Sequence, residues 1–399
     1  MHKYLHLLPD NNFLNPFIEI AEKISPGENK YIIHTPTIPF TKALKAQKIA
    51  HKNAIIAPYN SSFFPEAVGD VNSYDKIFIH FLSKESIDFI NRNASIKAKI
   101  IWLFWGSDFY SPYNYFKETL YDTRSLEYFN KHNTFVTQNS LLGNFAKNVK
   151  VKYIDPLFEQ KIIEEKAKAI KRIDAIGHWT KLDYDLIIKY FPTKAKYLPF
   201  IYYEHDYSKL EDQHETEHSS QFSKEHDLKN KTVILLGNSA SLTNNHFSAL
   251  DYLVKYKNEN IALICPMSYG DNKYRNAVIS YGNSLFGNNF IALLHLLPKT
   301  EYTALLANVD ISMMNHWRTE GAGNTMIMLA KKKKVILNSK STLFHFLKGE
   351  GITLYDINEP DLDMKSKINS IDASRNKEIL CNLFPYNKAC SFIEGLYQF

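Results

Sequence analysis

The first half of the chain alternates short apolar runs with polar stretches that have helical spacing. Several consecutive aliphatic or aromatic residues without a polar break are typical of strands that are buried on both faces. The strands expected here are Tyr4–Leu8, Tyr31–His34, Ala54–Ala57, Lys76–Phe81, Lys99–Phe104, Thr134–Thr137 and a short one near Tyr153. This βαβα order predicts a parallel sheet with helices on its faces.

The alternation restarts after a polar segment, Glu204 to Asn230, whose composition is typical of an interdomain linker. The strands expected beyond it are Thr232–Leu236, Ile261–Cys265, Phe290–Leu294, Val309–Met313 and Val335–Leu337. A short helix is expected at the end of the chain, and 399 residues are too many for one typical core. The predicted divisions are an α/β domain at 1–210, a linker at 211–230, a second α/β domain at 231–385 and a C-terminal helix at 386–399.

Charge and cysteine usage narrow the class of protein. The formal net charge of +6 is mild and comes without an arginine-rich tract, so no nucleic-acid partner is expected. The three cysteines, Cys265, Cys381 and Cys390, share no metal or redox spacing, which indicates a reducing cytoplasm. No stretch reaches the ~20 apolar residues of a membrane-spanning helix. Any membrane contact is therefore expected to be peripheral.

One candidate anion site follows the first strand of the second half. Gly237, Asn238 and Ser239 come directly after the apolar run, and a helix is expected from about Asn245. Backbone N–H groups in such a turn, together with a helix N-terminus, can bind a phosphate. The same residues also make an ordinary strand-to-helix turn, so both interpretations stay open.

The segment from Asn315 to Thr325 carries the densest set of candidate groups. Gly321 and Gly323 would let the backbone approach a diphosphate at the N-terminus of the following helix. Arg318 could pair with a phosphate, and Glu320 could bind ribose or sugar hydroxyls. The candidate residues for binding a nucleotide are Gly237, Asn238, Ser239, Tyr269, Arg318, Gly321, Gly323, Asn324 and Thr325, with Tyr269 lining a nucleobase pocket or, alternatively, belonging to a plain turn.

A third group of candidates lies in the first half. A strand ends at Trp105 and presents Asp108 and Tyr110 at its carboxyl end, where open α/β sheets bind ligands. A carboxylate beside aromatic rings suits sugar hydroxyls or general-base chemistry, but Asp108 is equally suited to cap a helix. His80 ends another strand at the same edge, although a single histidine is more often structural.

Motifs for several other chemistries are absent from the sequence. It contains no P-loop, no dinucleotide fingerprint after the first strand, no His-Glu-x-x-His and no Gly-x-Ser-x-Gly. Two Asp-x-Asp triplets, at Asp183 and at Asp361, are interpreted as surface segments because no apolar strand precedes them. No cofactor is expected, and a metal is not required in principle, because helix N-termini and basic groups can offset the charge of a diphosphate.

The motifs, taken in order, resemble those of glycosyltransferase family 56, the TDP-Fuc4NAc:lipid II Fuc4NAc transferases of enterobacterial common antigen synthesis. Where that family has Trp-Gly-Ala-Asp-Leu-Tyr, this chain has Trp-Gly-Ser-Asp-Phe-Tyr. The other matching positions are Gly237–Ser239, Asn245, His246, Pro266–Tyr269, Tyr302–Leu306, Asp310, Gly321, Gly323 and Asn338. The family has Gln at the position of Glu320, the insertion near 211–230 is longer here, and the first seventy residues match only in pattern.

The resemblance implies a GT-B fold, in which two Rossmann-like domains face a cleft and a C-terminal helix crosses back to the first. It implies a hexosyltransferase that moves a Fuc4NAc-like sugar from a dTDP-sugar to a lipid-linked saccharide, peripherally at the cytoplasmic face of the bacterial inner membrane. Catalytic roles are expected for Asp108, Glu320 and His80, and acceptor contacts for Trp105 and Tyr110. The alternatives are another nucleotide-sugar donor, a GT-B-fold epimerase, or a non-catalytic protein that binds a glycan or nucleotide sugar.

Overall fold

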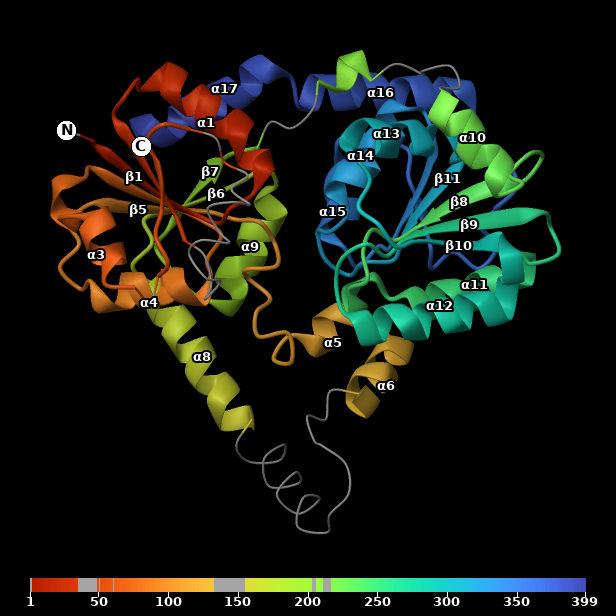
Figure 1. The fold of residues 1–399 in the computed structure, drawn as a ribbon, viewed down its shortest axis with the longest axis horizontal. Coiled ribbons are helices and arrows are strands. Elements are labelled where there is room, and N and C mark those ends of the chain that lie inside the picture. The colour runs from red at the N-terminus through yellow and green to blue at the C-terminus, as the bar shows by residue number, and fades with distance from the viewer. Residues whose placement is uncertain are drawn as a thin grey trace, which may run out of the picture. The chain divides into compact units, whose positions relative to one another are not determined.

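The computed structural model describes residues 2–34, 49, 51–59, 61–132, 155–202, 206–210 and 217–399. The chain forms two compact units (Figure 1). Unit 1 comprises residues 1–115, 150–205 and 385–399, and unit 2 comprises residues 116–149 and 206–384. Each unit contains one parallel sheet with helices on both faces, so the predicted α/β class with two sheets is confirmed.

Unit 1 is built on a seven-stranded sheet with the order β3-β2-β1-β4-β5-β6-β7. The strands are β1 Tyr4–Leu8, β2 Asn29–Ile33, β3 Ala54–Ile56, β4 Lys76–His80, β5 Lys99–Leu103, β6 Ala175–His178 and β7 Lys196–Pro199. The helices are α1 Asn15–Ile24, α3 Phe63–Val68, α4 Lys84–Arg92, α8 Asp155–Ile170, α9 Lys181–Tyr190 and α17 Tyr386–Gln398.

Unit 2 is built on a six-stranded sheet with the order β10-β9-β8-β11-β12-β13. The strands are β8 Thr232–Leu236, β9 Ile261–Pro266, β10 Phe290–Leu293, β11 Ile311–Met314, β12 Lys334–Leu337 and β13 Tyr355–Asp356. The helices are α5 Lys117–Leu120, α6 Thr123–His132, α10 Glu217–Glu225, α11 His246–Leu253, α12 Asn272–Phe286, α13 Lys299–Leu305, α14 Ala322–Ala330, α15 Thr342–Gly349 and α16 Ser370–Leu383. Helices α11 and α12 lie on one side of this sheet, and α13 and α14 lie on the other (Figure 1).

Most expected strands are present within one or two residues of the predicted bounds. Those expected at Thr134–Thr137 and near Tyr153 lie outside the described residues. The sequence analysis missed β6, β7 and β13, and the segment predicted as a linker contains helix α10. Residues 116–132 also group with unit 2, where Asp122 accepts a hydrogen bond from Ser248 and α6 packs on α11.

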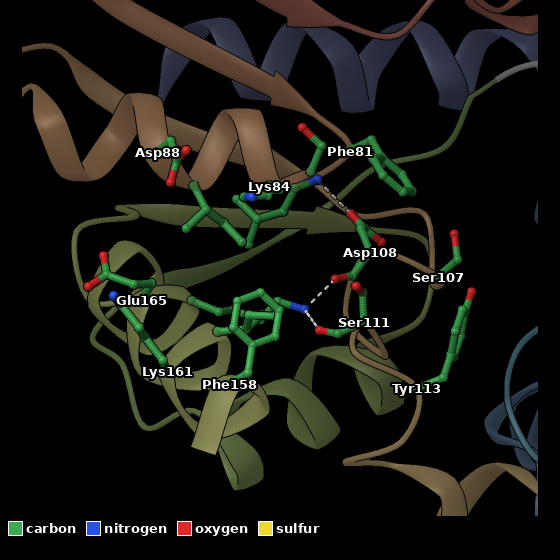
Figure 2. A pocket seen from close by; sticks show the side chains of 15 residues that line it. Phe81, Lys84, Asp88, Ser107, Asp108, Ser111, Tyr113, Phe158, Lys161 and Glu165 are labelled. Carbon is green, nitrogen blue, oxygen red and sulfur yellow. Dashed lines mark hydrogen bonds between the residues drawn. The ribbon is translucent and has the colours of Figure 1, made fainter. Parts of the chain in front are cut away.

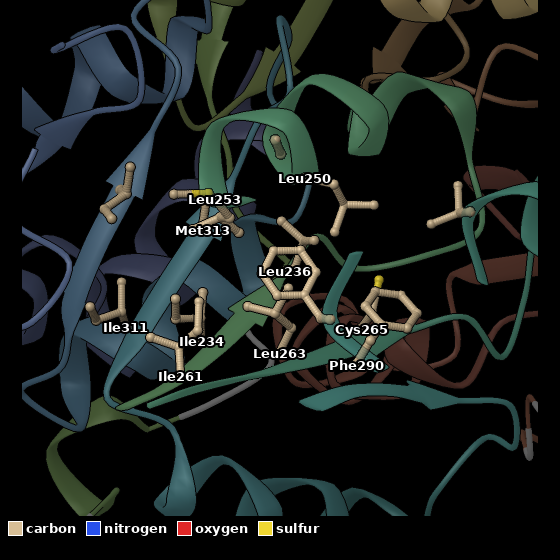
Figure 3. Packing of buried hydrophobic residues seen from close by; sticks show 14 of the residues in the cluster. Ile234, Leu236, Leu250, Leu253, Ile261, Leu263, Cys265, Phe290, Ile311 and Met313 are labelled. Carbon is tan, nitrogen blue, oxygen red and sulfur yellow. The ribbon is translucent and has the colours of Figure 1, made fainter. Parts of the chain in front are cut away.

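The core of unit 2 explains why its strands have such apolar sequences. Ile234 and Leu236 of β8 pack against Leu263 of β9 and Met313 of β11, and all four are at most 1% exposed (Figure 3). Leu235, which points to the opposite face of the sheet, is also fully buried. Burial of both faces is the reason that β8 contains no polar alternation.

The C-terminal helix α17 belongs to the core of unit 1. Its Ile393 and Leu396 are fully buried, and the helix packs against α1 and β7. The Tyr397 hydroxyl donates a hydrogen bond of 2.6 Å to Asn29 Oδ1, and Lys76 Nζ donates one of 2.6 Å to the Tyr397 carbonyl. These bonds join the end of the chain to the central strands of unit 1.

Buried histidines make both units sensitive to acid. Burial lowers the pKa of His6 to about 3 and of His34 to about 4 in unit 1, and of His246 to about 3 and of His316 to about 4 in unit 2. Because the unfolded histidines take up protons near pH 6.5 and the folded ones do not, stability is constant above pH 6.5 and decreases below it. At pH 5.5 each of these histidines is expected to lower the free energy of unfolding by roughly 1 kcal/mol.

Urea unfolding at pH 7.5, 6.5 and 5.5 measures this loss before most carboxylates protonate. The exposed His345 supplies the control, because replacing it with Gln is expected to leave the pH dependence unchanged. Equal stability at pH 7.5 and 5.5 would contradict the prediction.

Candidate functional site

The loops that follow β8 and β11 meet at the carboxyl edge of the sheet in unit 2. These two strands are neighbours although the chain makes two further strands between them, so the order of the sheet reverses at this point. Open α/β sheets bind ligands at such a reversal. The Gly237 N–H donates a hydrogen bond of 3.0 Å to the Met313 carbonyl and so joins the ends of both strands.

Gly237 is required by the geometry of the first loop. Its φ is +68°, and a Cβ would lie 2.6 Å from both Asn244 Oδ1 and His246 Nε2. Any larger residue would displace these side chains. The next N–H, that of Asn238, donates to Asn244 Oδ1 at 2.8 Å. The loop is therefore held in one conformation before any ligand binds.

Asn238 brings three of the predicted segments together. Its Oδ1 hydrogen-bonds His316 Nε2 at 3.0 Å, and its Nδ2 lies 3.5 Å from the Tyr269 hydroxyl. Gly321, with a φ of +66°, lies so close that its Cβ would be 3.7 Å from the Asn238 Cβ. Tyr269 is 53% exposed, which leaves its ring accessible at the rim.

Arg318 and Glu320, in the loop after β11, form an ion pair with each other. Arg318 Nη2 lies 2.7 Å from Glu320 Oε2, and the side chains are 7% and 12% exposed. Burial acts to raise the pKa of Glu320, but Arg318, His316 and a hydrogen bond with Thr243 outweigh it, so the pKa is lowered. The carboxylate is therefore ionised at neutral pH and can accept hydrogen bonds from hydroxyl groups.

The first turn of α14 completes the group. Gly321 is the residue that precedes the helix, and the Thr325 N–H bonds to its carbonyl at 3.0 Å. Gly323 is exposed, and nothing lies within 4 Å of the place where its Cβ would be. Asn324 hydrogen-bonds the Tyr302 hydroxyl, while Thr325 is fully buried. A helix start with this open backbone suits an anion.

A set of buried amides behind the loops went unassigned in the sequence analysis. Asn245 Nδ2 donates to the Asn315 carbonyl at 3.0 Å, and Asn338 Nδ2 donates to Asn315 Oδ1 at 2.7 Å. His316 was also missed, although it follows directly after β11 and faces Asn238. Its position after a buried strand was the available signal.

Asp108 of unit 1, for which a catalytic role is expected, is buried and hydrogen-bonded to its surroundings, and its catalytic role stays a prediction. Its side chain is 1% exposed, and its oxygens accept hydrogen bonds from Leu82 N at 3.0 Å, Trp102 Nε1 at 2.8 Å and Trp105 N at 3.2 Å. Burial raises its pKa, and these donors partly offset that effect. The carboxylate caps no helix, but it ties the end of β4 to the loop after β5.

His80, the other residue of unit 1 with an expected catalytic role, is also buried. It is fully buried, with Nε2 at 3.0 Å from His6 Nδ1 and Nδ1 at 2.7 Å from the Tyr202 hydroxyl. Burial, together with the neighbouring histidines His6 and His34, holds its pKa well below the usual range. Both ring nitrogens have hydrogen-bond partners within unit 1, and a catalytic role for His80 stays a prediction.

The two expected acceptor residues differ in their accessibility. Tyr110 is only 4% exposed, so its ring has little surface to offer. Trp105 is half-buried and donates from Nε1 to the Tyr202 hydroxyl at 3.1 Å. An acceptor contact for Trp105 stays a prediction.

Among the described residues, no three His, Cys, Asp or Glu side chains gather as a metal site requires. Asp183 is 3% exposed and lies after the buried strand β6, so the interpretation as surface was wrong for this residue, whereas the side chain of Asp185 in the same triplet is 45% exposed. Of the helices in the described ranges, none has the length and apolarity to cross a bilayer.

Comparisons with known proteins agree with this architecture. Residues 201–376 match the family 4-alpha-L-fucosyltransferase glycosyl transferase group 56. The whole chain superimposes on the Anabaena protein HepE in complex with UDP and glucose, with a TM-score of 0.67, 12% identity and coverage of 100% of both chains. A glycosyltransferase from Rickettsia africae gives a TM-score of 0.61 at 13% identity, with 100% of this chain and 98% of that chain covered.

A trehalose 6-phosphate synthase from Burkholderia multivorans has the same fold, with a TM-score of 0.61, 10% identity and coverage of 100% of this chain and 98% of that chain. At these identities the structures establish the fold alone. The family match over residues 201–376 agrees with the resemblance drawn from the motifs, and the structural similarity shows that the chain has the GT-B fold.

Proposed function

We propose that the chain transfers a Fuc4NAc-like deoxyamino sugar from a dTDP-sugar to a lipid-linked saccharide, at the cytoplasmic face of the bacterial inner membrane. The observation that carries the proposal is the meeting of the loops after β8, β9 and β11 around Asn238, beside the open start of α14. The family match and the motif order support the choice of sugar and acceptor.

In this proposal, the first turn of α14 binds the donor diphosphate. Its N–H groups and partial positive charge stabilise the leaving nucleotide as the glycosidic bond breaks. Glu320, ionised and fixed by Arg318, accepts hydrogen bonds from donor hydroxyls. Tyr269 packs against the nucleobase from the rim. No metal ion is needed for these contacts, and the stereochemical outcome is left open.

A thermal-shift comparison with dTDP, UDP, GDP, CMP and NAD tests the donor. A ligand that binds only the folded state raises the melting temperature, and selective stabilisation by dTDP is expected. A preference for UDP or GDP would mean that a different nucleotide sugar is the donor in the same type of transfer. No response to any nucleotide would contradict the proposal. Sugar conversion without an acceptor would indicate an epimerase, and donor binding without turnover would indicate a binding protein.

The substitution Gly323→Ala tests whether the donor diphosphate binds at the first turn of α14. A Cβ there meets no protein atom, and alanine in a helix is more stable than glycine by about 0.5–1 kcal/mol, so the folded protein is expected to gain stability. The methyl group would still obstruct a diphosphate at this backbone, and a roughly tenfold weaker dTDP affinity is expected. Gly349→Ala in α15 is the matched control, because that helical position is equally open and exposed. Unchanged dTDP affinity in Gly323→Ala would contradict the placement.

A further inference from the structure

A cavity of about 540 Å³ lies in unit 1 beside the carboxyl ends of β4 and β5. It is enclosed by the first turns of α4, the loop after β5 and helix α8. Its apolar wall is formed by Leu82, Ile87, Phe158 and Ile162. The volume is within the range of roughly 300–1,000 Å³ that is typical of small-molecule sites. Part of a substrate therefore fits inside unit 1 alone.

Large apolar side chains are exposed at the mouth of this cavity. Phe158 lines the cavity and is still 61% exposed, and Tyr113 is 38% exposed. Leu157, the residue before Phe158 on α8, is 72% exposed but does not line the cavity. Exposed apolar groups beside a pocket indicate a surface that receives an apolar ligand.

The charges around the cavity are unequally compensated. Of its carboxylates, Asp88 lies 3.8 Å from Arg92, whereas Glu165 accepts a hydrogen bond of 2.8 Å from the neutral amide of Asn91. Lys84 and Lys161 also line it, are exposed, and have no ion-pair partner among the described residues. These two ammonium groups are therefore available to contact an anionic group of a ligand.

The buried Lys166 has a different role at this cavity. Its Nζ donates to the carbonyls of Asp108 at 2.7 Å, Phe109 at 2.9 Å and Ser111, so it fixes the loop after β5 (Figure 2). Figure 2 also shows Asp88, Glu165 and Lys161 toward one end of the cavity, and Ser107 and Tyr113 toward the other. Polar and apolar groups thus share one rigid site.

We propose that this cavity binds the lipid end of the acceptor, with its apolar wall and Phe158 contacting the chain and with Lys84 and Lys161 contacting the attached phosphate. An apolar chain joined to a phosphate matches both features, whereas a free sugar or a free phosphate matches only one. The inference rests on the proposed function, since it takes the acceptor to be lipid-linked. It adds the place in unit 1 where the lipid is held.

Binding of farnesyl diphosphate to the full chain, measured by calorimetry, tests this inference. Phe158→Ser is expected to weaken binding roughly tenfold, because a large apolar contact is lost. Leu157→Ser, one residue away and also exposed, is the matched control and is expected to change binding less than twofold. The double variant Lys84→Gln with Lys161→Gln is expected to weaken binding several-fold, and the effect is expected to be larger at low salt. Lys168→Gln, which is exposed on α8 like Lys161, is expected to leave binding unchanged.

Three outcomes would overturn the inference. The first is that farnesyl diphosphate does not bind, and the second is that wild type and Phe158→Ser bind it equally. The third is that the soluble probe does not bind while Phe158→Ser and Leu157→Ser lose affinity for phosphatidylglycerol vesicles to the same extent. The last would assign the surface to a bilayer. The dTDP thermal shift is measured on the same variants and reports on unit 2. If the lipid probe binds and depends on the cavity residues, but dTDP causes no thermal shift, the donor proposal is rejected and the cavity is supported as the lipid-binding site.

Discussion

Replacing Glu320 with alanine is expected to lower the transfer rate, as kcat/KM, at least a hundredfold and to destabilise unit 2 by about 3 kcal/mol. The stability loss follows from the buried pair, because Arg318 lies 2.7 Å away and would keep its charge without this carboxylate. The rate loss follows from the proposed hydrogen bonds to the donor, which are worth more in an enclosed site than in water. Urea unfolding and initial rates measure the two effects separately.

The double variant Arg318→Met with Glu320→Leu separates structure from chemistry. Apolar residues often replace a buried ion pair at little cost, so much of the lost stability is expected to return. The transfer rate is not expected to return, because neither side chain can bind the donor. Recovery of the rate along with the stability would show that the pair only supports the fold.

Glu320→Gln supplies the conservative comparison. The family that the chain resembles has Gln at this position, and an amide oxygen still accepts a hydrogen bond from a hydroxyl. A rate within about tenfold of wild type is therefore expected, which corresponds to a loss of at most ~1.4 kcal/mol in transition-state binding. Glu350→Ala on the exposed end of α15 controls for the loss of one negative charge.

The strands with the clearest signal in the sequence are long and buried on both faces of their sheet. β8 and β9 are continuous apolar runs because helices cover both faces, and this leaves a clear signal in the sequence. β6 leaves no such signal, because it is short and contains Gly177. A Cβ at Gly177 would lie 2.7 Å from Leu103 Cδ2, so close packing with β5 requires a residue without a side chain.

The parts of the candidate site that depend on local backbone conformation could be predicted from the sequence. The parts that depend on which side chains contact each other could not. The small residues Gly237 and Gly321 mark loops after buried strands, and the structure places both beside Asn238 or its neighbours. The pairing of Arg318 with Glu320 depends on the path of the loop between them, which the sequence does not specify. The burial of Asp108 depends on contacts with Leu82, 26 residues away.

Replacing Asp108 with alanine is expected to destabilise unit 1 by about 3 kcal/mol. The N–H groups of Leu82, Trp102 and Trp105 would lose a buried acceptor, and each unsatisfied donor costs about 1–3 kcal/mol before the structure relaxes. Asp108→Asn is expected to cost less, because the amide keeps one acceptor oxygen. Thermal and urea unfolding measure this graded series.

The same series decides between the structural and catalytic roles of Asp108. If the carboxylate only holds the loop, the residual transfer rate of each variant is expected to follow its folded fraction, and both are expected to recover at low temperature. Ser107→Ala, one residue away and half-buried at the cavity, is the matched control and is expected to change stability by less than about 0.5 kcal/mol. An Asp108→Ala protein as stable as wild type but inactive would restore the catalytic assignment, because only direct contact with substrate would then account for the loss.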